Sequence, residues 1–187
     1  IIPQEATLFE GTLRFNLDPF SENSDAAIFD VLGRAQLREK VAQLPGGLGS
    51  LVKQGGSNFS VGERQLLCMA RALLRGSSVL VLDEATASVD MSTDDLIQET
   101  IRSSLLGCTV LCIAHRLNTV IFYDKILVLE QGQMVEYGSP FELISKKDGP
   151  FKALCAARGE AAFQKLYDTA AEQQQRHQHN SAADDHH

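Results

Sequence analysis

The sequence predicts an α/β fold whose strands form a parallel sheet. The unbroken apolar run at 79–82 is typical of a strand buried on both faces of such a sheet, and the apolar run at 108–114 is also typical of a buried strand. Helical patterns separate the runs, and the alternation of helix and strand over residues 60–158 favours a parallel arrangement. A chain of 187 residues is long enough for one domain with a sizeable core.

Short helices are predicted before the sheet begins. Residues 1–20 open abruptly, as though cut from a longer domain, and the next helix is capped by Ser24 or Asp25. Another helix is expected over 37–44, because the Pro-Gly-Gly sequence at 45–47 stops it. The helix after Ser24 carries its apolar residues at helical spacing, namely Ile28, Val31, Leu32 and Ala35.

A longer amphipathic helix is predicted to begin at Ser60. Ser60 and Glu63 have the spacing of a capping box, and Gly62 lets another group approach the first turn closely. Free N–H groups and the helix dipole make such a start a potential phosphate site, with Arg64 and Gln65 as further donors. Gly62→Asp is expected to oppose phosphate binding with little loss of folding. By itself, however, a capped helix start is more often a structural feature than a phosphate site. The apolar face consists of Leu66, Met69, Ala70, Leu73 and Leu74.

Candidate catalytic residues follow the two predicted strands. Asp83 and Glu84 come after the first, at the sheet edge where open α/β folds bind ligands. One carboxylate can hold Mg²⁺ and the other can orient or deprotonate a water molecule. His115 follows the second strand and can contact a phosphate oxygen or that water. The alternatives are that Asp83 only caps the next turn and that His115 is structural.

Composition excludes several classes of protein. With 17 basic and 24 acidic residues the net charge is −7, and no dense basic block offers a surface for nucleic acid. No apolar run approaches the roughly 18 residues of a transmembrane helix. The four cysteines are predicted to be reduced and mostly in the core, which favours a cytosolic compartment. Cys108 and Cys112 would lie roughly 13 Å apart along one strand, too far for a disulfide or a shared metal ion.

Five motifs together resemble the nucleotide-binding domain of ATP-binding cassette (ABC) transporters. The resemblance covers about 155 residues, and the motifs stand in the family's order. They are similar to the Q-loop (2–4), the signature motif (59–65), the Walker B strand with its catalytic glutamate (79–84), the D-loop (87–90) and the switch-histidine loop (113–116). Residues 9–20 and the Ser-Val-Gly form of the signature resemble the second cassette of subfamily C, the multidrug-resistance-associated exporters.

The resemblance implies a P-loop NTPase-like cassette that hydrolyses ATP with Mg²⁺ to drive export. Glu84 would be the general base and His115 would hold the γ-phosphate. Asp83 would hold Mg²⁺. Gln4 would contact Mg²⁺ or the attacking water and would relay nucleotide state to the membrane helices. Asp90 would bridge to a second nucleotide-binding domain that sandwiches ATP head to tail. The signature residues Ser60, Val61, Gly62 and Glu63 would contact the nucleotide held by that partner domain.

The resemblance also implies a domain organisation. Residues 1–158 would be the C-terminal portion of a cassette on the cytosolic face of a membrane, attached to transmembrane domains of the same transporter. Residues 17–59 would form the helical subdomain facing the membrane, and 126–129 and 134–138 a late hairpin. Beyond 159 a helical extension over 160–172 is expected, followed by a disordered tail rich in Gln, His and Asp.

A phosphate loop, Gly-x-x-x-x-Gly-Lys-Ser/Thr, does not occur in the sequence. We therefore expect the chain to be truncated before the Q-loop and to be inactive alone. Two alternatives stay open. One is a noncatalytic fragment that only pairs with a partner cassette. The other is a cassette ATPase acting on DNA or ribosomes, which the acidic balance and the absence of coiled-coil heptads disfavour.

Overall fold

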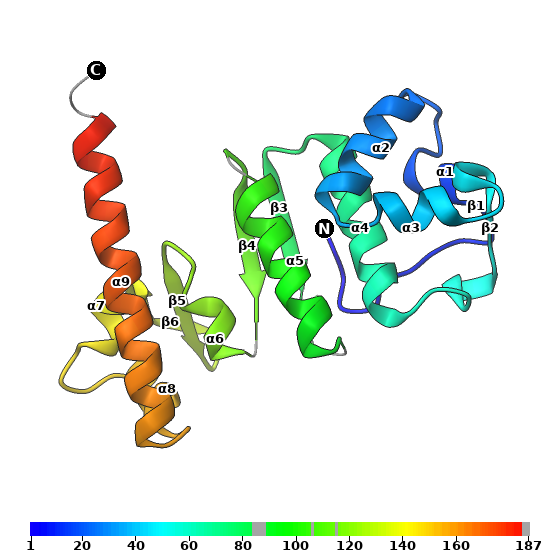
Figure 1. The fold of residues 1–187 in the computed structure, drawn as a ribbon. Coiled ribbons are helices and arrows are strands. Elements are labelled where there is room, and N and C mark those ends of the chain that lie inside the picture. The colour runs from blue at the N-terminus through cyan, green and yellow to red at the C-terminus, as the bar shows by residue number, and fades with distance from the viewer. Residues whose placement is uncertain (84–88, 106, 115, 185–187) are drawn as a thin grey trace. The chain divides into compact units, whose positions relative to one another are not determined.

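The computed structural model describes residues 1–83, 89–105, 107–114 and 116–184 (Figure 1). They belong to two compact units, residues 1–115 and 116–187, which are described here one at a time. Within the described residues, no helix is both long and apolar enough to cross a membrane.

The first unit contains the predicted parallel sheet. Strand β3 (Val79–Asp83) pairs in parallel with β4 (Thr109–Ile113), in a register that runs from Val79 opposite Thr109 to Asp83 opposite Ile113. Both strands therefore end at one edge of the sheet. The strands coincide closely with the two apolar runs, which confirms the predicted α/β class.

Burial of these strands differs from the prediction. Leu80 and Leu82 are buried in the core of the unit, whereas Val79 is 57% exposed and Leu111 is 56% exposed on the other face. The expectation that both faces are buried was therefore wrong for the structure described. The physical reason is that the helices of this unit pack against one side of the two-stranded sheet, and no described segment of the unit shields the other side.

The beginning of the chain lies beside β3. Ile2 forms an isolated parallel bridge with Leu82, with bonds from its N–H to the Val81 carbonyl (2.8 Å) and from the Asp83 N–H to its carbonyl (3.0 Å). Pro3 has no N–H and cannot extend this pairing, so the chain leaves the sheet there. Gln4 consequently follows the sheet at the end of β3 that carries Asp83.

Helices α2 (Asp25–Arg34) and α3 (Arg38–Gln43) form the predicted helical region, and α1 (Leu13–Leu17) is a further helix that was not predicted. The Ser24 hydroxyl accepts a bond from the Ala27 N–H, so Ser24 is the cap of α2. The apolar residues expected on this helix are all buried, and α2 packs against α4. Short strands β1 (Gly11–Thr12) and β2 (Leu51–Val52) pair antiparallel, and single 3₁₀ turns occupy Gly47–Gly49 and Gln54–Gly56.

Helix α4 (Val61–Arg75) is the central helix of the first unit. It begins at the predicted capping box of Ser60 and Glu63, and it ends at Gly76, whose φ of 60° is the left-handed conformation that glycine adopts readily. Its apolar face joins Leu80 and Leu82 in one core. Helix α5 (Met91–Ser104) is capped by Asp90 and contributes Ile97 to the same core.

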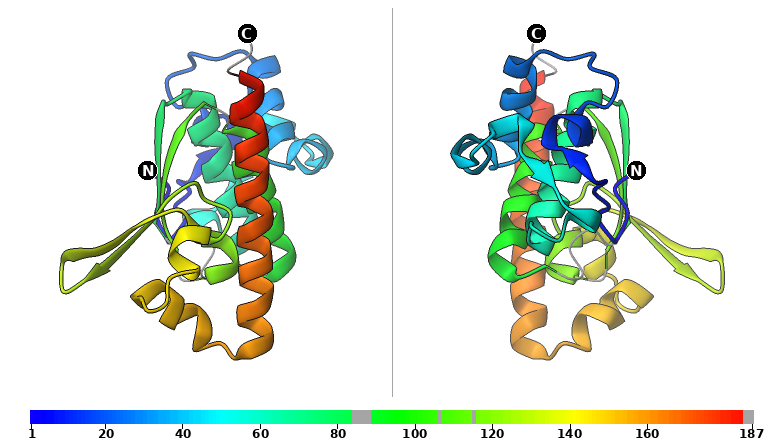
Figure 2. Two further views of the ribbon diagram at one scale, coloured as in Figure 1. Left: turned by 90° about the vertical axis from the view of Figure 1, so that its left-hand side faces the viewer. Right: turned by 90° about the vertical axis from the view of Figure 1, so that its right-hand side faces the viewer.

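The second unit begins with α6 (Leu117–Val120) and the predicted hairpin of β5 (Ile126–Glu130) and β6 (Gln133–Gly138). Figure 2 shows this hairpin projecting from the rest of the unit. Helices α7 (Pro140–Ile144), α8 (Pro150–Ala156) and α9 (Glu160–Asp184) follow and pack against one another. The buried Glu136 carboxylate joins hairpin and helices, because it accepts bonds from Lys146 (2.8 Å) and the Phe151 N–H (2.9 Å).

Helix α9 is longer than predicted. The sequence predicted helix over 160–172 and disorder beyond it, whereas the helix extends to Asp184. Alanine and glutamine are good helix formers, and adding residues to an existing helix costs far less than nucleating a new one. Packing is seen only in the first part of α9, where Leu166 and Ala170 are the last of the described side chains to be buried in the core of the unit.

All four cysteines are free thiols, as predicted. Cys68 and Cys155 are buried, and Cys108 and Cys112 are half-buried. Burial raises the pKa of Cys155 to about 11, which keeps this thiol protonated at neutral pH.

Candidate functional site

The end of β3 carries the first group of predicted site residues. Asp83 is exposed there, and its backbone N–H is bonded to Ile2, two residues before the exposed Gln4. The structure thus brings Asp83 and the Gln4 segment to one edge of the sheet. The predictions for Glu84 and His115 fall on residues outside those described, and both stay predictions.

The oxygen donors at this edge suit Mg²⁺. The ion prefers hard oxygen ligands, and it commonly takes one or two carboxylates and completes its coordination with water and substrate phosphates. Asp83 offers a carboxylate and Gln4 an amide oxygen. Among the described residues no cluster of three or more Asp, Glu, His or Cys could form an all-protein metal cage. The donors at this edge therefore fit an ion that takes one or two protein ligands and completes its coordination with other oxygen atoms.

The beginning of α4 carries the second group. The Ser60 hydroxyl accepts from the Glu63 N–H (3.2 Å), and the Glu63 carboxylate accepts from the Ser60 N–H (2.9 Å). The N–H groups of Val61 and Gly62, in the first turn, have no acceptor within the helix. Val61 is 40% exposed, so this end of the helix is accessible to a ligand.

Lys40 of α3 makes an ion pair with Glu63. Burial alone would raise the pKa of Glu63, but the Lys40 ammonium and the Ser60 N–H together hold it below its usual value. The negative charge at this helix start is thereby offset by a cation from the helical region. Sequence reasoning missed Lys40, since nothing in the spacing of residues 40 and 63 indicates the contact.

We expect Lys40→Met to lower the stability of the folded protein slightly, by about 0.5 kcal/mol at pH 7. The fold lowers the pKa of Glu63, so the ionised carboxylate stabilises the folded state. This stabilisation is fully present above the ordinary pKa of 4.5 and is lost as the pH falls through the lower pKa of the folded state. Urea unfolding should therefore show a difference between parent and variant at pH 7 that shrinks as the pH is lowered below 4.5. A difference that stays constant throughout the acid range in which the domain remains folded would exclude this ion pair as its cause.

Gly62 lies where the first turns of α4 and α5 meet. A Cβ atom at Gly62 would come within 2.4 Å of Thr93 Cγ2, far closer than atoms can approach. The group that the glycine allows to approach is therefore Thr93 of this same chain. The expectation that Gly62→Asp affects folding little was wrong, because any side chain here pushes α5 away.

Asp90 lies beside this contact. Its carboxylate accepts from the Thr93 N–H (3.0 Å) and the Thr93 hydroxyl (2.9 Å), so it caps α5. Thr93 thus touches Gly62 on one side and Asp90 on the other. The structure brings the predicted signature and D-loop residues together through a residue that the sequence did not single out.

The side chains of Gln65 and Arg64 both donate to backbone carbonyls of the chain. The Arg64 guanidinium donates to the Phe59 carbonyl (2.9 Å). Gln65 is only 3% exposed, and its side-chain Nε2 donates to the Gln4 carbonyl (2.7 Å). The prediction that Gln65 assists phosphate binding is therefore wrong for the structure described, since this buried side chain bonds within the chain, whereas the same prediction for Arg64 stays a prediction.

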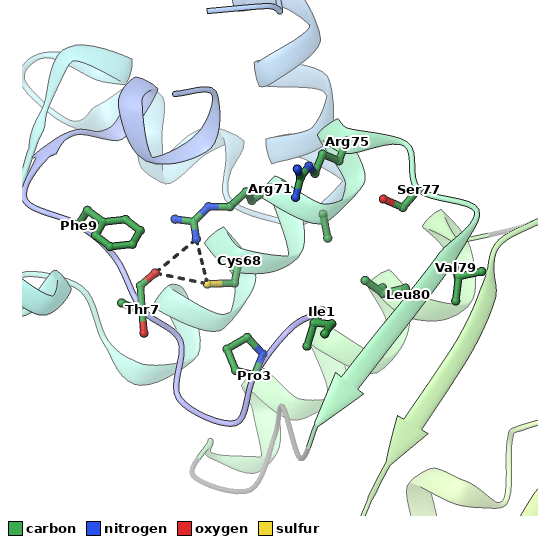
Figure 3. Close-up of a pocket in the computed structure, with 11 residues that line it drawn as sticks. Ile1, Pro3, Thr7, Phe9, Cys68, Arg71, Arg75, Ser77, Val79 and Leu80 are labelled. Atoms are coloured by element: carbon green, nitrogen blue, oxygen red, sulfur yellow. Dashed lines mark hydrogen bonds between the residues drawn. The ribbon is translucent and has the colours of Figure 1, made fainter. Parts of the chain in front are cut away.

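A cavity of about 190 Å³ lies between residues 1–9, the second half of α4 and the start of β3 (Figure 3). The Arg71 guanidinium points toward the Thr7 carbonyl (3.4 Å) and the Cys68 sulfur (4.0 Å) at its wall. None of the predicted site residues that the structure describes lines this cavity. It is therefore separate from the candidate site.

The sequence of this chain is similar to those of known proteins. The family model described as "ABC transporter" matches residues 1–87. The chain is 53% identical over 173 residues to the probable multidrug resistance-associated protein lethal(2)03659 of Drosophila melanogaster, covering 92% of this chain and 13% of that protein. It is 49% identical over 170 residues to human ATP-binding cassette sub-family C member 4, covering 91% of this chain and again 13% of the relative.

The fold of this chain is also similar to that of a solved ABC exporter. A bacterial Atm1-family ABC exporter with ATP bound superposes with a TM-score of 0.76 at 33% identity, over 85% of this chain and 28% of the exporter chain. The chain thus spans about 13% of the length of the curated relatives it matches.

Proposed function

Because the chain belongs to the ABC transporter family, within a nucleotide-binding domain of the multidrug-resistance-associated type, we propose that it takes part in ATP binding and hydrolysis that power export across a membrane. The observation that carries this proposal is the placement of the motif residues. Asp83 and the Gln4 segment occur at one sheet edge, and the helix start at Ser60 adjoins the Asp90 turn. The exporter relatives favour this function over a cassette that acts on DNA or ribosomes.

At the sheet edge, Glu84 is proposed to be the general base. A carboxylate can orient an attacking water and accept its proton as the γ-phosphoryl group is transferred. His115 is proposed to donate a hydrogen bond to the γ-phosphate. Asp83 and Gln4 would hold Mg²⁺, which when bound offsets the charge on the phosphate oxygens. The phosphate loop, which the sequence lacks, would come from residues outside this chain.

At the start of α4, Ser60, Val61, Gly62 and Glu63 are proposed to contact the nucleotide held by a second cassette. The free N–H groups of Val61 and Gly62 and the positive end of the helix dipole both favour an anion there. Glu63 would oppose it, and its ion pair with Lys40 supports the proposal because it offsets that charge. Asp90 would contribute to the same interface.

In the full-length transporter, we expect Asp83→Asn to raise the Mg²⁺ concentration for half-maximal ATPase activity about tenfold or more. The amide keeps the shape of the carboxylate but loses the charge that attracts the ion. Titration of Mg²⁺ at saturating ATP measures this. Asp95→Asn, an exposed position on α5, is the matched control and should leave the titration unchanged. An unchanged midpoint in Asp83→Asn would contradict the metal role.

A further inference from the structure

One face of α4 bonds the backbone of residues 3–7 through side chains. Gln65, Cys68 and Arg71 follow each other at intervals of three residues, so they lie along one side of the helix. Gln65 donates to the Pro3 and Gln4 carbonyls, and Cys68 and Arg71 both reach the Thr7 carbonyl. The segment is thereby tied to the helix at both its beginning and its middle.

These bonds replace the backbone pairing that ends at Pro3. Carbonyl groups of the chain need hydrogen-bond partners once they leave a sheet, and here the partners are side chains of α4. The bond from Gln65 Nε2 to the Gln4 carbonyl is short, at 2.7 Å, while the one to Pro3 is longer, at 3.4 Å. The position of the Gln4 backbone therefore depends most directly on Gln65.

The buried amide of Gln65 lowers the stability of the fold. Its side chain is 97% buried, and within the described part of the chain its Oε1 has no hydrogen-bond partner. A buried polar atom without a partner lowers stability, whereas an apolar side chain of the same length would avoid that loss. The unpartnered Oε1 of Gln65 therefore lowers the stability of the fold, while the Nε2 of the same amide bonds the Gln4 carbonyl.

We propose that Gln65 is a positioning residue for Gln4, which fixes the Q-loop backbone on the helix that begins at Ser60. This inference rests on the proposed function, since it assigns a task to Gln65 only if Gln4 acts in ATP turnover. Gln4 and the helix start are then placed by one rigid element. A shift of α4 along its axis moves the Gln4 backbone with it.

The test uses Gln65→Met in the full-length transporter. Methionine has about the same length and fills the same buried space, but it cannot donate to the Gln4 carbonyl. The expected result is at least a fivefold fall in kcat for ATP, with KM for ATP within twofold and a melting temperature within about 3 °C of the parent. Gln43→Met makes the same chemical change at an exposed position of α3 and should alter none of these quantities.

A double-mutant cycle separates positioning from a general loss of structure. Gln4→Ala and Gln65→Met should each slow turnover, and the double variant should be no slower than the slower single variant. Gln65→Leu should show the same split between kcat and KM. Independent, multiplicative effects would overturn the proposal. So would variants at 65 that lose kcat, KM and thermal stability together, because that pattern denotes a purely structural residue.

The same variants distinguish the role of Gln4 in hydrolysis from the role of Gln65 in positioning it. If Gln4→Ala leaves kcat unchanged, the proposed role of Gln4 in hydrolysis is wrong, and the positioning role falls with it. If Gln4→Ala slows turnover while Gln65→Met does not, Gln4 keeps its role and only the role assigned to Gln65 is overturned.

Discussion

Glu84→Gln in the full-length transporter is expected to reduce ATP turnover by about 100-fold or more. The amide has nearly the shape of the carboxylate, but it cannot accept the proton of the attacking water. ATP binding should persist, because the substitution removes no group proposed to hold the phosphates. Steady-state phosphate release measures turnover, and equilibrium binding of labelled ATP at low temperature measures occupancy.

The matched control is Glu99→Gln, which makes the same change on the exposed face of α5, where Glu99 pairs only weakly with Arg102 (3.3 Å). It should retain the turnover of the parent. Turnover of Glu84→Gln within about twofold of the parent would remove Glu84 from the proposed mechanism, whatever the role of its neighbours.

Gly62→Ala is expected to have the second-largest effect, because it acts on packing and on ATP turnover together. The added Cβ would overlap Thr93 Cγ2, so the first turns of α4 and α5 must separate. Overpacking of this kind costs about 1–3 kcal/mol, and we expect ATPase activity to fall at least tenfold. Thermal unfolding and ATPase assays on the full-length transporter measure the two effects.

Thr93→Ser distinguishes packing from phosphate binding. Serine lacks the methyl group that Gly62→Ala would strike, yet it keeps the hydroxyl that bonds Asp90. The double variant Gly62→Ala with Thr93→Ser should therefore regain most of the lost stability. If its activity stays low, Gly62 contributes to the nucleotide site beyond packing. Full recovery of activity along with stability would show that the glycine serves only the contact between the helices.

Local patterns in the sequence predicted the secondary structure well. The caps at Ser24 and Ser60 and the strand at 79–82 each depend on residues close together in the chain, and all three were confirmed. The motif at 59–65 likewise identified the helix start correctly. What it could not reveal is the use of each side chain, since Gln65 and Arg64 lie beside the helix start in sequence but bond elsewhere.

Contacts between distant residues escaped prediction. Lys40 with Glu63, Thr93 with Gly62, and Gln65 with Gln4 join positions 23 to 61 residues apart, and no periodicity encodes such pairs. Burial of β3 was overestimated for a related reason. An apolar run indicates that a strand can be covered on both faces, but it does not show which segment covers each face.

The bridge between Ile2 and Leu82 has a consequence for the order of folding. It closes a loop of 80 residues, whereas pairing β3 with β4 brings together positions only 30 apart. By chain entropy alone, the longer closure costs about 0.9 kcal/mol more. It is also a single bridge, while the β3–β4 ladder pairs five residues on each strand. We therefore expect residues 1–9 to dock after β3 has paired with β4.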